Sequence, residues 1–352
     1  MNSYRKTLTK IKKDYFHTLS NDFPEFLWDY IDTPPMQRIN TISIACGTDY
    51  TALFNHKFFY SNLDHSIGVA LIIWHFTHDK KQTLAGLFHD IATPAFKHCI
   101  DFLNNDYEKQ ESTEELTTKI ISESKEIVNL LKRDHLSIEE INDYHQYPIA
   151  DNDTPKLSSD RLEYTFSNGL FFDSQEIWDV KQIQHFYDQL TILKNEEGID
   201  EIGFTNAKAA EEYIHYTNRI WRFWISNKDK ITMQFIADVI RKMDEKKLIS
   251  KKDLYQLSEA EIIHKIENCH DPYITSRFAL FRKTKQIEES NSPILGQYCI
   301  NLNVKKRYAI PLVKNEEVCQ RIDQISPAAK QDIDNYLADM QPPYVAFHFD
   351  FS

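Results

Sequence analysis

Histidines gather in the first third of the chain, and their neighbours suggest shared chemistry. His65 opens an apolar helical pattern that runs to residue 76, with Gly68, Val69 and Ile72 on the same face. Because residues three, four and seven apart share one side of a helix, the imidazole of His65 is predicted to point inward. An inward histidine either bonds a carbonyl in the core or acts as a metal ligand.

A second apolar helical pattern, over residues 82–92, ends in the dipeptide His89-Asp90. Ala85 and Gly86 stand one turn earlier and allow another helix to approach closely. Burying a carboxylate costs several kcal/mol unless it is paired or ligates a cation. The dipeptide therefore indicates either a structural ion pair or a metal site.

Helix-start signals place two further polar residues. Thr93-Pro94 is predicted to be the N-cap and first residue of a new helix, which puts His98 one turn inside it. Asp160 follows a polar loop over residues 145–158 and is predicted to cap the next helix. The inner face of that helix is expected to carry Leu162, Phe166 and Leu170.

Taken in order, His65, His89-Asp90 and Asp160 resemble the H…HD…D signature of the HD superfamily of metal-dependent phosphohydrolases. Longer stretches resemble motifs of its deoxynucleoside triphosphate triphosphohydrolase branch or of related bacterial proteins. These are DTPPMQRINTISIACG (32–47), NLDHSIGVA (62–70), HDIATPAFKH (89–98), SSDRLEY (158–164) and VKKRYAIPLV (304–313). The resemblance covers roughly residues 32–170 and a short C-terminal piece.

The resemblance implies a metal centre held by His65, His89, Asp90 and Asp160. Two imidazoles and two carboxylates suit one divalent ion per chain (Mn, Fe, Ni, Co, Zn or Mg) and leave open positions for water or substrate.

Asp90 and His98 are expected to take part in catalysis, with His98 as proton donor or phosphate clamp. Arg161 and Tyr164 match family positions that contact phosphate and sugar, and Lys97 is a further candidate for substrate binding. The other cations considered for phosphate binding are Lys57, Arg219 and Arg222.

Three positions depart from the family pattern. Asn62 stands where the family has an arginine, Thr93 where it has a histidine, and Ile44 where it has a glutamine. In the triphosphohydrolases these positions contact the sugar and the phosphates. The expected function is therefore a metal-dependent phosphohydrolase acting on a nucleotide and similar to a dNTP triphosphohydrolase. The alternatives are a nucleoside monophosphatase or phosphodiesterase of HD type, and a non-catalytic HD protein that binds a metal or a nucleotide.

Composition excludes several other classes. Formal net charge is −12, so a broad basic surface for a nucleic-acid polymer is not expected. Among only seven glycines no pair forms G-x-G-x-x-G, and Gly198 and Gly203 have P-loop spacing without the Lys-Ser/Thr that must follow. The five cysteines never form a C-x-x-C pair.

No apolar run suits a signal peptide or membrane span, so the protein is expected to be cytoplasmic. The family resemblance also implies a homo-oligomer.

The predicted fold class is mainly α, an HD-domain helical bundle with a small C-terminal α+β unit. Residues 1–290 are expected to form the helical domain, with its HD core at about 32–245, and residues 291–352 the small unit. Alternation from Ile300 to Leu312 predicts a hairpin that turns near Lys305–Arg307. Ser326-Pro327 predicts a helix start, and the alternation of VAFHFDF (345–351) predicts a strand.

Overall fold

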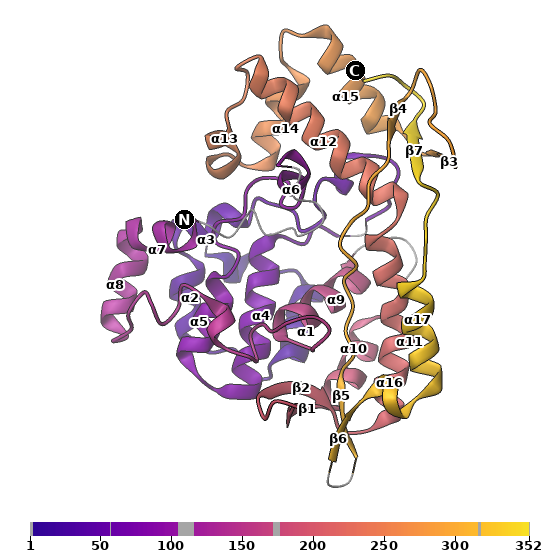
Figure 1. Cartoon of the computed structure of the whole chain (residues 1–352). Coiled ribbons are helices and arrows are strands. Elements are labelled where there is room, and N and C mark those ends of the chain that lie inside the picture. The colour runs from indigo at the N-terminus through magenta and orange to yellow at the C-terminus, as the bar shows by residue number, and fades with distance from the viewer. Residues whose placement is uncertain (1–2, 57, 105–115, 172–176, 316–317, 352) are drawn as a thin grey trace.

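The computed structural model describes residues 3–56, 58–104, 116–171, 177–315 and 318–351 (Figure 1). Its α-helices are α1 (Lys10–Leu19), α2 (Phe26–Ile31), α3 (Pro34–Ile39), α4 (Asn62–Thr77), α5 (Lys80–Phe88), α6 (Cys99–Leu103), α7 (Thr117–Glu123), α8 (Lys125–Arg133), α9 (Ser159–Phe171), α10 (Val180–Tyr187), α11 (Ala207–Trp224), α12 (Asn227–Glu245), α13 (Lys251–Gln256), α14 (Glu259–Glu267), α15 (Pro272–Lys283), α16 (Ile322–Ile325) and α17 (Pro327–Leu337). Its strands are β1 (Leu190–Lys194), β2 (Asp200–Phe204), β3 (Glu288–Ser290), β4 (Tyr298–Ile300), β5 (Leu312–Asn315), β6 (Val318–Arg321) and β7 (Tyr344–Phe347). The fold is thus mainly α with two small sheets.

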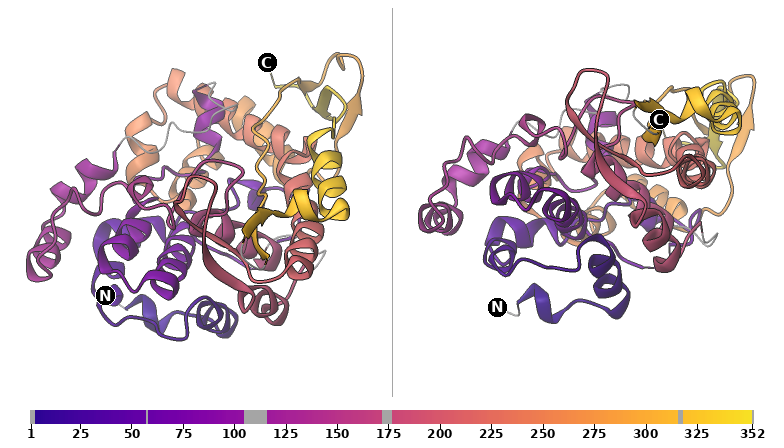
Figure 2. Two further views of the ribbon diagram at one scale, coloured as in Figure 1. Left: turned by 60° about the horizontal axis from the view of Figure 1, so that its bottom comes forward. Right: turned by 90° about the horizontal axis from the view of Figure 1, so that it is seen from below.

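Helix α4 lies at the centre of the part that carries the histidines. Every residue from Asn62 to Ile73 is buried, as expected for a helix that is apolar on nearly all sides. It packs against α5 and α9, and α1 and α3 contact it as well. Helices α7 and α8 lie at the edge of the molecule in both views of Figure 2. Among the helices of the described residues, none combines the length and apolar character needed to cross a membrane.

One hairpin lies inside the region that was predicted to be helical. Strands β1 and β2 pair antiparallel, with Leu190 opposite Phe204, and Gly198 takes the positive φ of 74° in the turn between them. The predicted helical domain of residues 1–290 thus contains a hairpin that the sequence analysis did not predict. Five-residue strands carry too few alternating positions to stand out, although a short loop containing glycine between two apolar runs is a hairpin signal.

The predicted hairpin between Ile300 and Leu312 is wrong. Strand β4 pairs with β7, and β5 pairs with β6 and with β2, so the order of the larger sheet is β1-β2-β5-β6 and that of the smaller one β3-β7-β4. Residues 301–311 belong to no strand and cross the molecule between the two sheets (Figure 1). Alternation predicts extended backbone, but it does not say which strand will be the partner.

One C-terminal prediction is confirmed and another is confirmed in part. Helix α17 begins at Pro327, and the Ser326 hydroxyl accepts the backbone N–H of Ala329 as its N-cap. Strand β7 (Tyr344–Phe347) covers only the first three residues of the alternating stretch 345–351. The division at residue 290 stays a prediction, and both of the larger apolar cores draw on residues from either side of it.

Candidate metal centre and its cavity

The first turn of α4 sets the position of His65. Ser61 and Asp64 form a capping box, in which the Ser61 hydroxyl accepts the Asp64 N–H and the Asp64 carboxylate accepts the Ser61 N–H. His65 comes next and is buried, with only 1% of its surface exposed. The inward orientation predicted for it is therefore confirmed.

Asp79 is the N-cap of α5, which ends at Phe88, so His89 is its C-cap residue and Asp90 follows in a turn. The Nδ1 of His89 bonds the carbonyl oxygen of Gly86 at 2.7 Å. A Cβ on Gly86 would lie 2.3 Å from Cδ1 of Ile73 on α4, which confirms the close helix approach expected at this glycine.

Helix α9 begins two residues earlier than expected. Asp160 was predicted to be the N-cap, but it lies in the first turn of the helix, where the Ser158 hydroxyl accepts the Arg161 N–H at 3.2 Å. Serine and aspartate are both good caps, and the sequence pattern does not say which of two residues so close together takes that place. Leu162, Phe166 and Leu170 are buried, as predicted.

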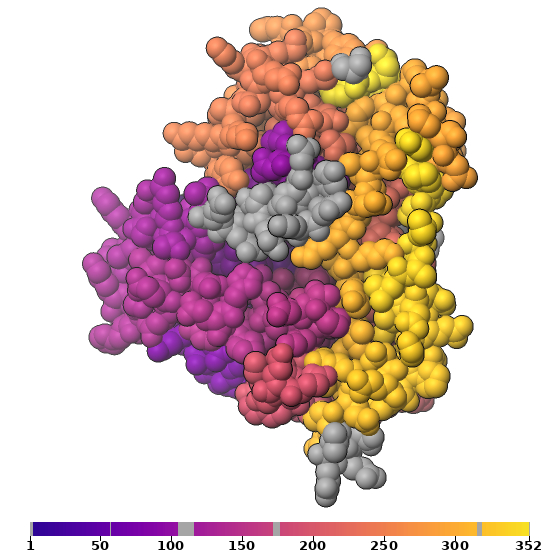
Figure 3. Space-filling model, viewed as in Figure 1, coloured from indigo at the N-terminus to yellow at the C-terminus, as the bar shows by residue number. Residues whose placement is uncertain are grey.

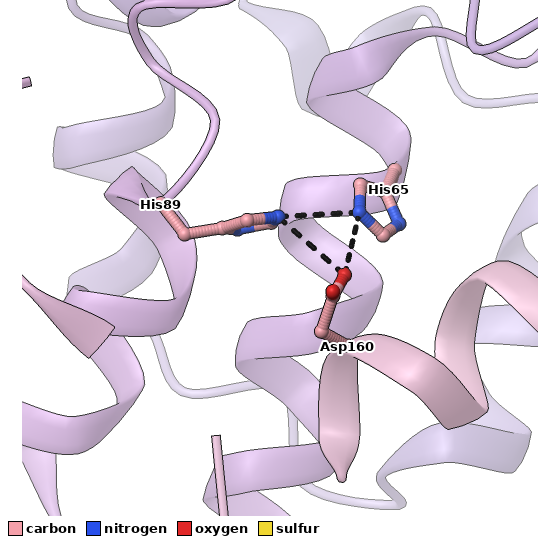
Figure 4. A group of neighbouring side chains, drawn as sticks. All are labelled: His65, His89 and Asp160. Carbon is pink, nitrogen blue, oxygen red and sulfur yellow. Dashed lines mark hydrogen bonds and ion pairs between the residues drawn. The ribbon is translucent and has the colours of Figure 1, made fainter. Parts of the chain in front are cut away.

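The three helices bring the predicted ligands together (Figure 4). The Nε2 atoms of His65 and His89 lie 3.2 Å apart, and Oδ1 of Asp160 lies 3.1 Å from the first and 3.6 Å from the second. These three residues form a group whose ligand atoms lie within 4.8 Å of one another. Asp90 joins it from the turn after α5, with Oδ2 3.4 Å from Nε2 of His89 and 3.7 Å from Nε2 of His65.

Hydrogen bonds leave the Nε2 atom of each histidine facing the centre of this group. The Gly86 carbonyl can only accept, so His89 carries its proton on Nδ1 in the neutral form. Nδ1 of His65 bonds the Glu163 carboxylate, which also accepts the hydroxyls of Tyr60 at 2.6 Å and Tyr15 at 3.1 Å. In neutral imidazoles both Nε2 lone pairs then point at the carboxylates of Asp90 and Asp160.

The spacing of these donor atoms fits a single metal ion. Ligand bonds of about 2.1 Å at angles between about 90° and 110° put neighbouring donors about 3.0–3.4 Å apart. Of the five separations given above, those of 3.1, 3.2 and 3.4 Å fall in this range, and those of 3.6 and 3.7 Å lie just above it. The side chains of the two histidines are 2% and 4% exposed, and those of Asp90 and Asp160 15% and 18%, so the group is reached from the carboxylate side.

Electrostatics in the group favour a bound cation. Burial alone would raise the pKa of Asp90, but Lys97 and the two histidines hold it well below its usual range. Asp160 is likewise held ionised against the effect of burial, chiefly by its hydrogen bond to His65. Burial lowers the pKa of His65, yet Glu163 and Asp160 outweigh it and raise the net value to about 9. A metal ion would compete with that proton, so metal binding is expected to release it.

The segment that carries Lys97 and His98 does not have the predicted helical structure. No helix begins at Thr93-Pro94; α6 begins at Cys99, and His98 precedes it. The backbone N–H groups of Ala95 and Phe96 are bonded to the Leu254 carbonyl and the Glu259 carboxylate, at 2.7 and 3.0 Å, rather than to a helical turn. Tertiary contacts with α13 and α14 therefore override the helix-start signal.

This turn places Lys97 beside the predicted ligands and His98 in the wall of the same cavity. Lys97 takes a positive φ of 42°, and its Nζ contacts Oδ2 of Asp90 at 2.6 Å and Oδ1 of Asn62 at 3.0 Å. His98 bonds Oδ2 of the buried Asp101 through Nδ1 at 2.8 Å, which leaves its Nε2 for other partners. Burial is the main reason why the pKa of His98 is lowered.

Arg161 and Tyr164 lie on α9 beside the cluster, but Arg161 is already engaged. Its guanidinium donates to Oδ1 and the carbonyl of Asn152 at 2.9 Å each, and to the Lys156 carbonyl. Among the other cations considered, Arg219 is exposed and Arg222 pairs with Asp339. Lys57 lies outside the described residues.

A cavity of about 570 Å³ opens beside the cluster. That volume lies in the range of about 300–1,000 Å³ that is typical of small-molecule sites. The predicted site residues that line it are His65, His89, Asp90, Lys97, His98, Asp160, Arg161 and Tyr164. All of the predicted site residues thus share one cavity.

Sequence reasoning missed three residues in or beside this cavity. Glu163, which holds His65, stands three residues after Asp160 and so on the same side of α9; that spacing was the available signal. Asp229 lines the cavity, and burial raises its pKa to about 8. Arg307 also lines it, from the motif VKKRYAIPLV.

Fold and site together define a mainly α-helical protein with a His-His-Asp group suited to a metal ion. No protein-family model matches the chain. Uncharacterized protein YdhJ of Bacillus subtilis (strain 168) is 23% identical over 314 residues, which cover 87% of this chain and 91% of that protein.

Two solved structures share the fold. A hypothetical protein from Aquifex aeolicus aligns with a TM-score of 0.63 and 17% identity, covering 92% of this chain and 91% of that one. A protein from Bacteroides thetaiotaomicron that is named a phosphohydrolase aligns with a TM-score of 0.62 and 12% identity, covering 92% and 96%.

Proposed function

We propose that this protein is a metal-dependent phosphohydrolase of HD type that acts on nucleotides. The observation that carries the proposal is the convergence of two Nε2 atoms and a carboxylate oxygen, with a second carboxylate at 3.4–3.7 Å from the histidines, at the wall of a cavity large enough for a nucleotide. The fold shared with a protein named a phosphohydrolase supports the same class.

The ligands would be His65, His89, Asp90 and Asp160. When bound, a divalent ion supplies Lewis acidity toward a phosphoryl oxygen and lowers the pKa of a coordinated water. Glu163 and the Gly86 carbonyl keep both imidazoles turned toward the ion through their Nδ1 atoms. His98, oriented by Asp101, would donate a proton to the leaving group or hold a phosphate through Nε2. Lys97 neutralises charge beside Asp90, and Tyr164, which lines the cavity, would contact the sugar.

The finer assignment is a dNTP triphosphohydrolase-like activity. Asn62, Thr93 and Ile44 replace family residues that contact sugar and phosphate. Asn62, at the sequence position of the family's arginine, accepts a hydrogen bond from Lys97. A nucleoside monophosphatase, a phosphodiesterase and a non-catalytic HD protein are therefore alternatives that the experiment must separate.

The test begins with metal analysis of the purified wild-type protein and of Asp160→Ala by inductively coupled plasma mass spectrometry. We expect about one ion per wild-type chain and a large loss in the variant. Both proteins, reconstituted with Mn or Fe, are then incubated with a panel of deoxynucleotides and ribonucleotides, and the products are separated by ion-exchange chromatography. The proposal expects hydrolysis that is at least about 100-fold slower in the variant.

The products decide the branch. Tripolyphosphate indicates a triphosphohydrolase, orthophosphate a monophosphatase, and a nucleoside monophosphate from a cyclic or dinucleotide substrate a phosphodiesterase. A protein that binds the ion but hydrolyses none of these, and melts at a lower temperature without the ion, would be the non-catalytic HD protein. Absence of a bound ion after reconstitution would contradict the metal site itself.

A further inference from the structure

The segment 301–311, here called the strap, links the two sheets across the face of the molecule. In the space-filling view it lies on the face turned to the viewer, in orange beside the yellow C-terminal residues (Figure 3). Its backbone is held at its far end, where the Ile310 N–H donates to the Pro155 carbonyl at 2.7 Å and Arg321 donates to the Ile310 carbonyl at 2.9 Å. Near its start, the Leu302 carbonyl accepts Nζ of Lys230 at 3.4 Å.

Three consecutive cations stand in the middle of the strap, and they face two sides. Lys306 points toward the end of α17, where its Nζ contacts the carbonyls of Leu337 and Asp339 at 2.6 and 2.9 Å. Lys305 and Arg307 instead line the cavity of the candidate metal centre. This is the alternation expected of extended backbone, in which neighbouring side chains point in opposite directions.

Several contacts locate the guanidinium of Arg307 within the cavity wall. Its Cζ lies 5.9 Å from the centre of the Tyr164 ring, and its carbonyl accepts the hydroxyl of Tyr336 at 3.1 Å. Burial is the main cause of the lowered pKa of His98, and the positive charge of Arg307 lowers that pKa further. The charge also opposes the rise that burial imposes on the pKa of Tyr164. Arg307 therefore lies where its charge acts on both a predicted catalytic residue and a predicted substrate contact.

Three further cations, Lys97, Lys156 and Arg161, line the same cavity. Lys97 contacts Asp90 at 2.6 Å, Lys156 pairs with Glu197 at 2.8 Å, and Arg161 donates to Asn152. A nucleotide brings several negative charges, and a net-acidic protein must offset them locally. The strap supplies cations to this wall that the HD motif residues do not provide.

We propose that Arg307, with Lys305 beside it, is an anion-binding residue that holds the phosphate groups of the substrate in this cavity. The inference rests on the proposed function and adds a residue from the C-terminal strap to the substrate site. It assigns to the motif VKKRYAIPLV a direct role in binding: Lys306 fixes the strap to α17, and the cations on either side of it face the phosphates.

The test compares the metal-loaded wild-type protein with Arg307→Met and Arg307→Lys. Methionine keeps an apolar stem against Tyr164 without the charge, whereas lysine keeps the charge. Inorganic phosphate is the probe, titrated by isothermal calorimetry and by thermal shift. Lys330→Ala, which removes an exposed cation of α17 that pairs with Asp334, is the control for net charge. Metal content and the melting temperature without phosphate are measured for every variant.

We expect Arg307→Met to bind phosphate about 10-fold more weakly or worse, with unchanged metal content, and Arg307→Lys to recover most of that loss. Lys330→Ala should bind as the wild type does. The inference would be overturned if Arg307→Met and Arg307→Lys bound phosphate with affinities that agree within twofold. If the role of Arg307 were purely structural, the phosphate affinity would not depend on the charge of the residue at this position. If the wild type hydrolyses no nucleotide, the proposed function fails, yet phosphate binding still decides the role of Arg307.

Discussion

His65 depends on a residue that lies 98 positions further along the chain. The Glu163 carboxylate is fully buried and accepts from Nδ1 of His65 as well as from two tyrosine hydroxyls. Through this hydrogen bond the carboxylate fixes both the tautomer and the rotation of the imidazole. How well His65 can bind a metal ion therefore depends on Glu163 as much as on the histidine itself.

Replacing Glu163 by glutamine should weaken metal binding about 10- to 100-fold, because the amide cannot offer the same acceptor to His65 Nδ1. Competition with a chromophoric chelator measures the affinity. Tyr60→Phe is the control, since it removes a hydrogen bond to Glu163 but leaves its contact with His65, and we expect little change in metal affinity. Equal affinities in wild type and Glu163→Gln would mean that the carboxylate does not orient the ligand.

Helices α4 and α9 can place these side chains only because they approach closely at one glycine. An added Cβ at Gly68 would lie 2.6 Å from both Cγ and Oε1 of Glu163. The same construction at Gly86 on α5 meets the far end of Ile73, a side-chain tip that can turn away. Gly68 therefore allows the close contact between α4 and α9, and Gly86 allows that between α4 and α5. Of the two glycines, only Gly68 borders Glu163, which bonds His65.

Gly68→Ala is predicted to lower the free energy of unfolding by about 1–3 kcal/mol and to reduce metal content, because it displaces Glu163. Gly86→Ala should retain the ion, and its better helix propensity offsets part of the crowding at Ile73. Urea unfolding and metal analysis of the two variants provide the comparison. A Gly86→Ala protein that loses more metal than Gly68→Ala would show that the α4–α9 contact is not the critical one.

Across the whole molecule, N-terminal and C-terminal segments are built into common layers. Strand β2 pairs with β5, and Ile322, Ile333 and Tyr336 belong to the same core as residues of α1 and α4. The strap then brings C-terminal cations to a cavity whose metal-binding side chains come from α4, α9 and the end of α5. The small C-terminal unit is thus part of the candidate site as well as of the core.

A fragment of residues 1–290 should consequently fail to fold, since it would expose the edge of β2 that pairs with β5 and the apolar face that α17 covers on α11. Circular dichroism and thermal melting of the purified fragment test this expectation, with the full chain as reference. A cooperative melt near that of the full chain would instead support a separable helical domain ending at residue 290.

Local patterns were sufficient for the elements that carry the ligands. The apolar faces around His65 and Asp160 and the cap at Ser326 depend on residues within a turn or two, and sequence spacing records such contacts directly. Resemblance to the HD signature then selected His65, His89, Asp90 and Asp160 from among 14 histidines and many carboxylates. The structure brings those four together, and their role as ligands stays a prediction.

Long-range contacts account for what the patterns did not show. The turn at residues 93–98 follows from bonds to Leu254 and Glu259, the β1-β2-β5-β6 sheet joins strands more than 100 residues apart, and Glu163 meets His65 only after α4 and α9 pack. Periodicity indicates which face of an element is buried, but it does not name the residue on the other side. Partners of this kind are set when the elements pack, because many pairs of apolar faces are compatible and the complete chain selects one arrangement.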